Sequence, residues 1–210
     1  MKTGADLLVP ARAAGVVLFA HGSGSSRHSP RNKFVAAQLR AAHLGTLLID
    51  LLTPQEDEVY RTRFDIALLT ERLAEAARAL AREPQTRHLA VGLFGASTGA
   101  AAALEVAAAM PESIRAVVSR GGRPDLASRA ALRKVRAPTL LIVGGEDSGV
   151  IELNEQAYAE LGSEKRLEIV PGATHLFEEP GKLEEVARLA TQWFTRHLGE
   201  AAVPAKGATR

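Results

Sequence analysis

Residues 88–109 read HLAVGLFGASTGAAAALEVAAA. The first seven residues are almost continuously apolar, as expected of a strand that is buried on both faces of a sheet. Seven of the last twelve are alanine, and these residues predict a helix that can lie close to that sheet. Between them, Gly95-Ala96-Ser97-Thr98-Gly99 forms the pattern G-x-S-x-G in the strand–turn–helix context that this pattern requires. The stretch therefore predicts a sharp turn with Ser97 at its tip.

The chemistry of such a turn depends on its small residues. Gly95 and Gly99 lack the Cβ atoms that would collide where strand and helix close on each other. Ser97 then projects its hydroxyl above the sheet as a candidate nucleophile. The backbone N–H of Thr98 lies at a helix N-terminus, where it can stabilise a carbonyl oxyanion. The alternative is a tight Gly-Ser turn with no chemical role.

The rest of the chain repeats this alternation of short apolar runs and longer, often alanine-rich segments. Strands are predicted at Val16–Ala20, Thr46–Asp50, His88–Phe94, Ala116–Ser119, Thr139–Val143 and Leu167–Val170, with a weaker one near Asp6–Pro10. Helices are predicted at Arg31–His43, Phe64–Ala81, Thr98–Ala109, Gly149–Leu161 and Lys182–Leu198, with Gly162 and Gly199 as C-terminal stops. This alternation indicates an α/β fold with a mostly parallel central sheet and helices on both faces.

The length of 210 residues predicts a single domain. We expect residues 1–200 to form it, without an insert long enough for a cap domain. Residues 201–210 lack apolar periodicity and are expected to form a flexible C-terminal tail. Because ligands bind at the carboxyl ends of the strands in open sheets of this kind, the loops that follow strands are the candidates for chemistry.

A serine nucleophile needs a base, and the base needs an acid to orient it. His175 directly follows the last predicted strand, and it is a better placed base than the five other histidines of the chain. Asp147, just past the penultimate strand, is the expected acid, and Glu146 and Asp125 are its rivals. The order Ser97, Asp147, His175 matches the chain order Ser…Asp…His. The alternatives are a loop histidine bonded to the backbone and an aspartate that caps the next helix.

The loop after the first strong strand reads His21-Gly22-Ser23-Gly24-Ser25-Ser26. Its position is that of the loop that contributes a second oxyanion N–H group. Ser23 is the expected donor, and Gly24 is the alternative. No lysine follows in the pattern G-K-[ST], so a phosphate-binding P-loop is not expected.

Arginines gather in the same loops. Arg27 and Arg31 follow the first strong strand, and Arg120 follows a strand farther along the chain. Guanidinium groups at the carboxyl end of a sheet can bind carboxylate or phosphate with two parallel hydrogen bonds. We therefore expect these three residues to bind an anionic group of the substrate. Alternatively, they are solvated or hold nearby carboxylates in place.

The composition argues against several classes of protein. The absence of cysteine excludes a disulfide scaffold, a Cys-ligated metal site and a cysteine nucleophile. Lys and Arg number 26 against 24 Asp and Glu, and aromatic residues make up 4% of the chain, so a nucleic-acid-binding surface is not expected. No apolar run approaches the ~20 residues needed to span a bilayer. We expect a cytoplasmic protein without membrane contact.

Taken together, these motifs resemble those of the α/β-hydrolase superfamily, and within it the small, lidless group similar to dienelactone hydrolases. The serine turn, the ordered acid and histidine, and the His-Gly loop carry this resemblance over nearly the whole chain. The nucleophile of true dienelactone hydrolases is a cysteine. The resemblance therefore implies that Ser97 takes the place of that cysteine here. Residues 21–32, HGSGSSRHSPRN, also resemble hydrolase-like domains associated with phosphoribosyltransferases, which implies a nucleotide or phosphoribosyl context without naming a reaction.

We therefore expect a serine hydrolase of small ester, lactone or thioester substrates that works through an acyl-enzyme on Ser97, without a metal or cofactor. Its expected partner is a small-molecule substrate, and the sequence is compatible with a monomer or a homodimer. The alternative is a non-catalytic regulatory or interaction domain that retains the fold. Such a module has no physical need for the serine, the histidine and the aspartate together, which favours the enzyme.

Overall fold

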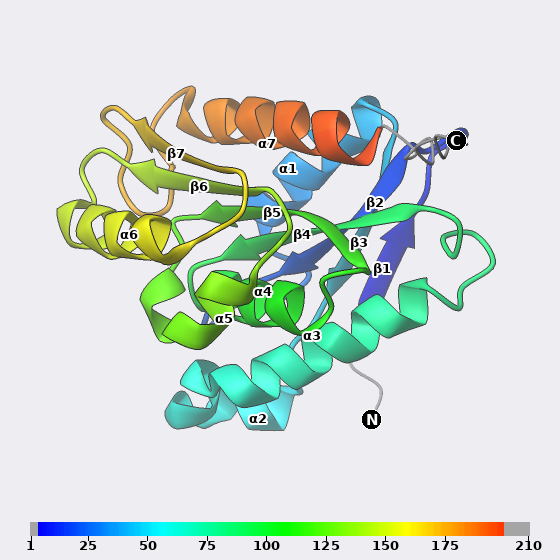
Figure 1. Cartoon of the computed structure of the whole chain (residues 1–210), viewed down its shortest axis with the longest axis horizontal. Coiled ribbons are helices and arrows are strands. Elements are labelled where there is room, and N and C mark those ends of the chain that lie inside the picture. The colour runs from blue at the N-terminus through cyan, green and yellow to red at the C-terminus, as the bar shows by residue number, and fades with distance from the viewer. Residues whose placement is uncertain (1–3, 200–210) are drawn as a thin grey trace, which may run out of the picture.

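The computed structural model describes residues 4–199 and builds them around a single sheet of seven strands in the order β1-β3-β2-β4-β5-β6-β7 (Figure 1). β1 pairs with β3 in antiparallel fashion, and all other neighbouring strands are parallel. The strands are β1 (Ala5–Leu8), β2 (Gly15–Ala20), β3 (Leu44–Ile49), β4 (Ala90–Ala96), β5 (Ile114–Arg120), β6 (Thr139–Gly144) and β7 (Lys165–Val170). The predicted α/β class and mostly parallel sheet are confirmed.

Helices cover both faces of this sheet (Figure 1). They are α1 (Pro30–Ala41), α2 (Pro54–Glu58), α3 (Ile66–Leu80), α4 (Thr98–Ala109), α5 (Arg129–Lys134), α6 (Ser148–Glu160) and α7 (Lys182–Leu198). α1 and α7 pack on one face, where the rings of Phe19 and Phe94 lie 4.8 Å apart. α3, α4 and α6 pack on the other face. There, residues 100–103 of α4 are fully buried alanines, which lets this helix lie close to the sheet as predicted.

The expected elements are all present, and their bounds shift by at most a few residues. The sequence did not predict the short helices α2 and α5. α2 is only five residues long and is stabilised by a capping box, in which Thr53 and Glu56 each accept a hydrogen bond from the other's backbone N–H. A helix this short has no apolar periodicity by which it can be recognised.

The expected burial of the last strand on both faces needs correction, whereas the expected stop of the last helix at Gly199 is confirmed. β7 is not buried on both faces, because it lies at the edge of the sheet, and only Val170 among its residues is fully buried. Gly199 does cap α7, but in a right-handed conformation with φ −75°. This stop therefore does not use the left-handed freedom of glycine.

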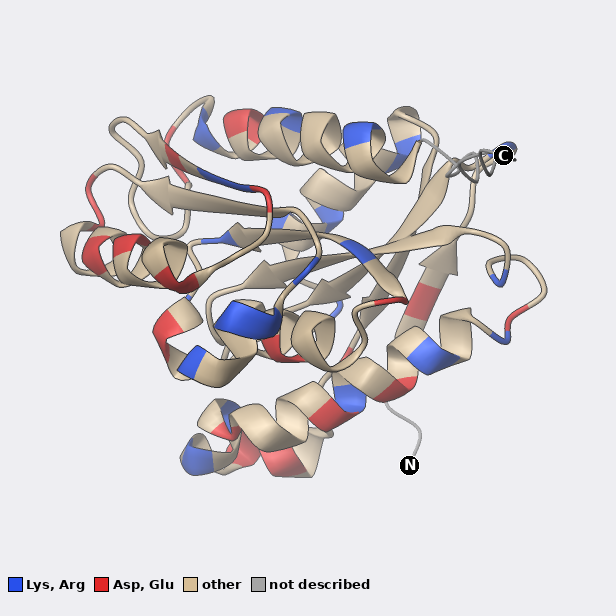
Figure 2. Cartoon of the chain, viewed as in Figure 1, with Lys and Arg blue, Asp and Glu red and all other residues tan. Residues whose placement is uncertain are grey.

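Charged residues of both signs are interspersed along the helices and loops (Figure 2). None of the helices within residues 4–199 is long and apolar enough to cross a membrane. The predicted tail, residues 201–210, lies outside the described residues.

Candidate active site

Ser97 lies between β4 and α4 in a sterically strained conformation, with φ 49° and ψ −120°. The end of β5 and the loop directly after it hold this turn through its peptide groups. The Ser97 N–H donates to the carbonyl of Arg120 over 3.3 Å, and the Ser97 carbonyl accepts from the N–H of Arg123 over 3.1 Å. The Ser97 side chain makes no capping hydrogen bond to α4, so its hydroxyl is not used to stabilise the helix.

The glycines of the turn are needed for close packing, as the sequence predicts. A Cβ atom on Gly95 would collide with the backbone of Ala100 at the start of α4. A Cβ atom on Gly99 would collide with the carbonyl of Ala20 at the end of β2. The tight turn therefore brings the N-terminus of α4 against the loop that follows β2.

His175 and Asp147 lie in the loops that follow β7 and β6, two neighbouring strands. Their side chains meet over 2.6 Å, from His175 Nδ1 to Asp147 Oδ2. Because a carboxylate can only accept, Nδ1 carries the hydrogen, and Nε2 is left to accept a proton. Asp147 occupies the N-cap position of α6 but makes no side-chain capping bond there. Its carboxylate therefore serves the histidine and not the helix.

The two rival acids lie elsewhere. Asp125 binds Arg123 with two hydrogen bonds of 2.8 and 2.7 Å. Glu146 is exposed, and its backbone N–H donates to the carbonyl of Ala173 over 3.0 Å, which ties the two loops together. The structure thus brings Asp147 to His175, and neither Glu146 nor Asp125.

Gly121 is a supporting residue that sequence reasoning missed. It follows β5 with φ 50°, and a Cβ atom there would lie 3.0 Å from the His175 carbonyl oxygen and 3.5 Å from the ring atoms Cε1 and Nδ1. Only glycine combines this conformation with such a close approach. The pair Gly121-Gly122, one residue beyond the predicted strand Ala116–Ser119, is the pattern in the sequence that could have indicated this role.

The predicted oxyanion loop runs beside the serine turn. A Cβ atom on Gly22 would lie 3.0 Å from Ser97 Cβ. The exposed Ser23 follows, and among the described residues its backbone N–H finds no acceptor. Thr98 is the first residue of α4, where helix geometry leaves the N–H without an intrahelical partner. Gly24, the alternative donor, adopts φ 65° in the same loop.

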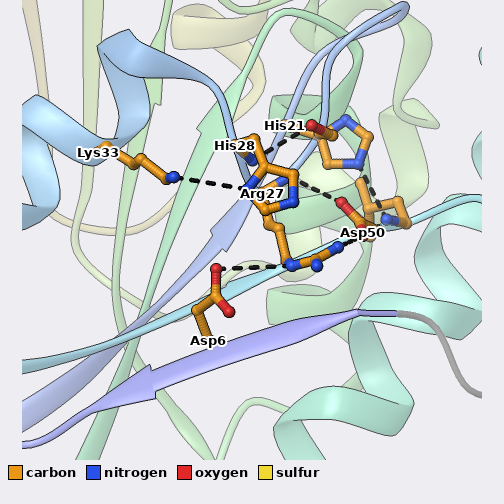
Figure 3. A network of polar contacts seen from close by, with 8 residues as sticks. Asp6, His21, Arg27, His28, Lys33 and Asp50 are labelled. Carbon is orange, nitrogen blue, oxygen red and sulfur yellow. Dashed lines mark hydrogen bonds and ion pairs between the residues drawn. The ribbon is translucent and has the colours of Figure 1, made fainter.

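His21 anchors this loop to the end of β3 (Figure 3). Its Nε2 accepts from the Leu51 N–H over 2.9 Å, and its Nδ1 donates to the Gly22 carbonyl over 2.9 Å. Both bonds require a neutral imidazole with the hydrogen on Nδ1. Burial lowers the pKa of His21 below its ordinary value, which favours that neutral form. This role of His21 was also missed, because the sequence does not show that Leu51 lies beside it.

The three arginines proposed from the sequence have different surroundings. The Arg27 guanidinium binds Asp50 and lies 3.5 Å from Asp6, and its backbone N–H also donates to Asp50 over 2.8 Å (Figure 3). Arg27 is thus already paired with carboxylates of the protein. Arg31 binds the exposed Glu178 over 2.6 Å, whereas Arg120 is buried and forms no ion pair with any residue from 4 to 199.

Within residues 4–199, no three His, Cys, Asp or Glu side chains gather in a way that could hold a metal ion. The loops at the carboxyl end of the sheet carry a serine in a strained turn and a histidine–aspartate pair. Two backbone N–H groups there, those of Ser23 and Thr98, have no acceptor among residues 4–199. A serine presented on such a strand-to-helix turn is the mark of the α/β-hydrolase class.

Comparison with known proteins gives the same class. Residues 13–197 match the family described as alpha/beta hydrolase domain, and the chain belongs to that family. A crystal structure of dienelactone hydrolase from Anabaena variabilis is 58% identical, with a TM-score of 0.90 over 94% of this chain and 93% of that one. Est1E from Butyrivibrio proteoclasticus shares the fold at 15% identity, with a TM-score of 0.78 over 93% of this chain and 94% of that one.

A curated relative from Mycobacterium tuberculosis is named "Putative phosphoribosyl transferase". It is 58% identical over 192 residues, which are 91% of this chain and 43% of the relative. The chain therefore spans less than half the length of that protein.

Proposed function

We propose that the protein is a serine hydrolase that cleaves small ester, lactone or thioester substrates through an acyl-enzyme on Ser97. The observation that carries the proposal is the 2.6 Å hydrogen bond between His175 and Asp147. It fixes the histidine in the tautomer whose Nε2 can take a proton from a serine hydroxyl. The Ser97 hydroxyl, which is not used as a helix cap, is the nucleophile that this base would serve.

In the proposed first half-reaction, Ser97 Oγ attacks the carbonyl carbon while its proton moves to His175 Nε2. Asp147 stabilises the imidazolium that forms. The carbonyl oxygen, now negatively charged, accepts hydrogen bonds from the backbone N–H groups of Thr98 and Ser23. In comparable sites each such donor contributes about 3 kcal/mol to transition-state stabilisation. The imidazolium then protonates the leaving oxygen or sulfur as the bond to the acyl carbon breaks.

In the second half-reaction, water attacks the acyl-enzyme. His175 takes one proton from that water, and the hydroxide oxygen bonds to the acyl carbon. The same N–H groups hold the second oxyanion. Collapse of this intermediate releases the acid and returns the proton to Ser97 Oγ, so that the protein ends in its starting state.

A panel of short-chain 4-nitrophenyl esters, thioesters and lactones tests this function. The wild type should hydrolyse at least one of these classes, and Ser97→Ala should lose nearly all of that activity. Ser113→Ala is the matched control, because Ser113 is exposed just before the start of β5, at the end of the parallel strands opposite the serine turn. Hydrolysis that is equally fast in Ser97→Ala and in Ser113→Ala would contradict the proposal.

One observation favours a second candidate, a regulatory or interaction domain. The chain spans 43% of the Mycobacterium tuberculosis relative, so a domain of this kind occurs there joined to a longer chain. This candidate predicts no turnover of any ester in the panel. It also gives no role to the hydrogen bond between His175 and Asp147.

A further inference from the structure

Arg120 is a buried cation that the proposed mechanism does not use. Arg120 is only 6% exposed, and its Nη2 donates a long hydrogen bond of 3.4 Å to Asn32 Oδ1. Its Nε is buried and has no acceptor among residues 4–199, and the guanidinium carbon lies 6.0 Å from the centre of the Phe177 ring. An amide and an aromatic face compensate a buried charge only in part. Arg120 therefore has no negatively charged partner among residues 4–199 to balance its charge.

The position of Arg120 links it to the candidate active site. It is the last residue of β5, and its carbonyl holds the N–H of Ser97. The next residue, Gly121, packs against the ring of His175. The side chain of Arg120 reaches Asn32 in the first turn of α1 and Phe177 in the histidine loop. An anion bound to this guanidinium would thus lie at the carboxyl end of the sheet, where the proposed chemistry takes place.

A second guanidinium adds positive charge there. Burial, and to a smaller extent the charge of Arg31, lowers the pKa of Arg120 to about 10. Arg120 thus remains protonated at neutral pH. The Nε of Arg31 is also buried without an acceptor. Its one carboxylate partner, Glu178, has a side chain that is 60% exposed, so water can replace this contact at little cost.

We propose that Arg120, assisted by Arg31, binds an anionic group of the substrate, either a carboxylate or a phosphate. This rests on the proposed hydrolase function and adds to it a substrate class, that of negatively charged acyl compounds. A guanidinium fork matches both anions in geometry, and the oxygens of an anion are the kind of acceptor that both Nε atoms lack among residues 4–199. The anion supplies the counter-charge that the described protein does not give to Arg120.

The main test compares three chromogenic esters in the purified full chain. They are the 4-nitrophenyl monoester of succinic acid, its neutral methyl ester, and the 4-nitrophenyl carboxylic ester of 3-phosphonopropanoic acid. The wild type should prefer at least one anionic ester over the neutral one by roughly ten- to a hundred-fold in kcat/KM. Preference for the succinyl ester identifies a carboxylate site, and preference for the phosphono ester identifies a phosphate site.

Variants separate recognition from support of the fold. Arg120→Met should reduce the preference to near unity, Arg31→Met should reduce it in part, and Arg120→Lys should retain some of it because the charge remains without the fork. Arg133→Ala is the control, because Arg133 is on α5 and bound to Glu160, and it should keep the wild-type preference. If Arg120 only supports the histidine loop, Arg120→Met slows both kinds of ester equally. That result overturns the proposal, as does an equal rate for all three esters in the wild type.

A binding measurement distinguishes failure of this inference from failure of the hydrolase function. Ser97→Ala cannot form an acyl-enzyme, so it reports binding alone. Succinate or inorganic phosphate, each at several times its dissociation constant, should raise the Tm of this variant by about 2–4 °C. The reference is the Tm in chloride at the same ionic strength. Adding Arg31→Met should reduce that rise, which keeps the test open if Arg120→Met does not fold. An unchanged Tm in both anions overturns the anion site even if neutral esters are hydrolysed. A rise in Tm without any ester hydrolysis supports the site and contradicts the proposed function.

Discussion

At the scale of single residues, the candidate site depends on one strained backbone and one short hydrogen bond. Ser97 adopts φ 49°, a conformation that its own side chain disfavours, and the end of β5 and the loop directly after it hold it there. His175 is oriented by Asp147 over 2.6 Å. If these residues form one nucleophile–base unit, the loss of any member disables the others.

Ser97→Ala and His175→Ala are therefore each expected to remove nearly all ester hydrolysis while the fold is retained. The double variant should be barely slower than either single one, because members of such a unit do not contribute additively. Steady-state kcat/KM for the best ester of the panel, with circular dichroism as the check on folding, makes the comparison. Multiplicative losses in the double variant would show that the two residues act independently.

Asp147→Asn should reduce kcat by on the order of 10⁴-fold, because an amide does not hold the hydrogen on Nδ1 of His175. Glu146→Gln and Asp125→Asn are matched controls with the same chemical change, and both should cost far less. A loss in Asp125→Asn larger than that in Asp147→Asn would place the acid after β5 and refute the assignment.

His21 gives a prediction about stability and pH. Its pKa in the folded protein is lowered by burial, so the unfolded chain takes up this proton at a higher pH than the folded chain. The contribution of His21 is complete above its ordinary pKa of 6.5, and it is lost as the pH falls from there through the lowered folded-state pKa. In that window the loss is about 1.4 kcal/mol per pH unit.

His21→Gln should remove this slope, since glutamine can accept the Leu51 N–H but takes up no proton. Urea unfolding between about pH 7.5 and 5.5 measures the free energy of unfolding in wild type and variant. His28→Gln is the control, because His28 is exposed in the same loop, and it should keep the wild-type slope. The same pH dependence in wild type and His21→Gln would mean that His21 is not held neutral.

At the scale of elements, the start of α4 must approach the end of β2 closely enough for the serine turn and the loop after β2 to meet. Gly99, the second residue of α4, permits this contact, because its missing Cβ would strike the Ala20 carbonyl. Gly149 is also the second residue of its helix, α6, but a Cβ there would meet nothing within 4 Å. The two glycines thus form a matched pair, one crowded and one open.

Gly99→Ala should lower the free energy of unfolding by about 1–3 kcal/mol or more, because backbone atoms must move to admit the methyl group. Gly149→Ala should raise it by up to about 1 kcal/mol, because alanine is the better helix former and has room. Urea unfolding of both variants beside the wild type provides the comparison. Equal effects of the same sign would show that the contact between α4 and β2 is not close.

At the scale of the whole molecule, the alternation of strands and helices was sufficient to predict the fold class, because buried parallel strands are nearly continuous apolar runs. The meeting of Asp147 and His175 could also be predicted, since both follow neighbouring strands that end at the same edge of the sheet. The pairing of Arg27 with Asp50 could not. It depends on the end of β3 lying beside the loop after β2, and no local pattern in the sequence encodes that contact.

The edges of the sheet were also the least predictable parts. β1 is four residues long and mostly exposed, so its apolar pattern is weak and its antiparallel pairing with β3 depends on the tertiary fold.

The burial of Arg120 beside Phe177 could not be predicted from the sequence either, because Phe177 contacts it from the loop after β7. The sequence could place these groups at one end of the sheet but could not say which of them had partners.

The measurement that tests the central claim most directly is the reaction of the intact protein with a fluorophosphonate. This reagent forms a covalent bond with a serine that is activated by an adjacent base. We predict one adduct per chain by intact-protein mass spectrometry, located to Ser97 by peptide mapping. The adduct should be absent in Ser97→Ala, and it should form far more slowly in His175→Ala. No adduct in the wild type, or an adduct on another serine, would contradict the account.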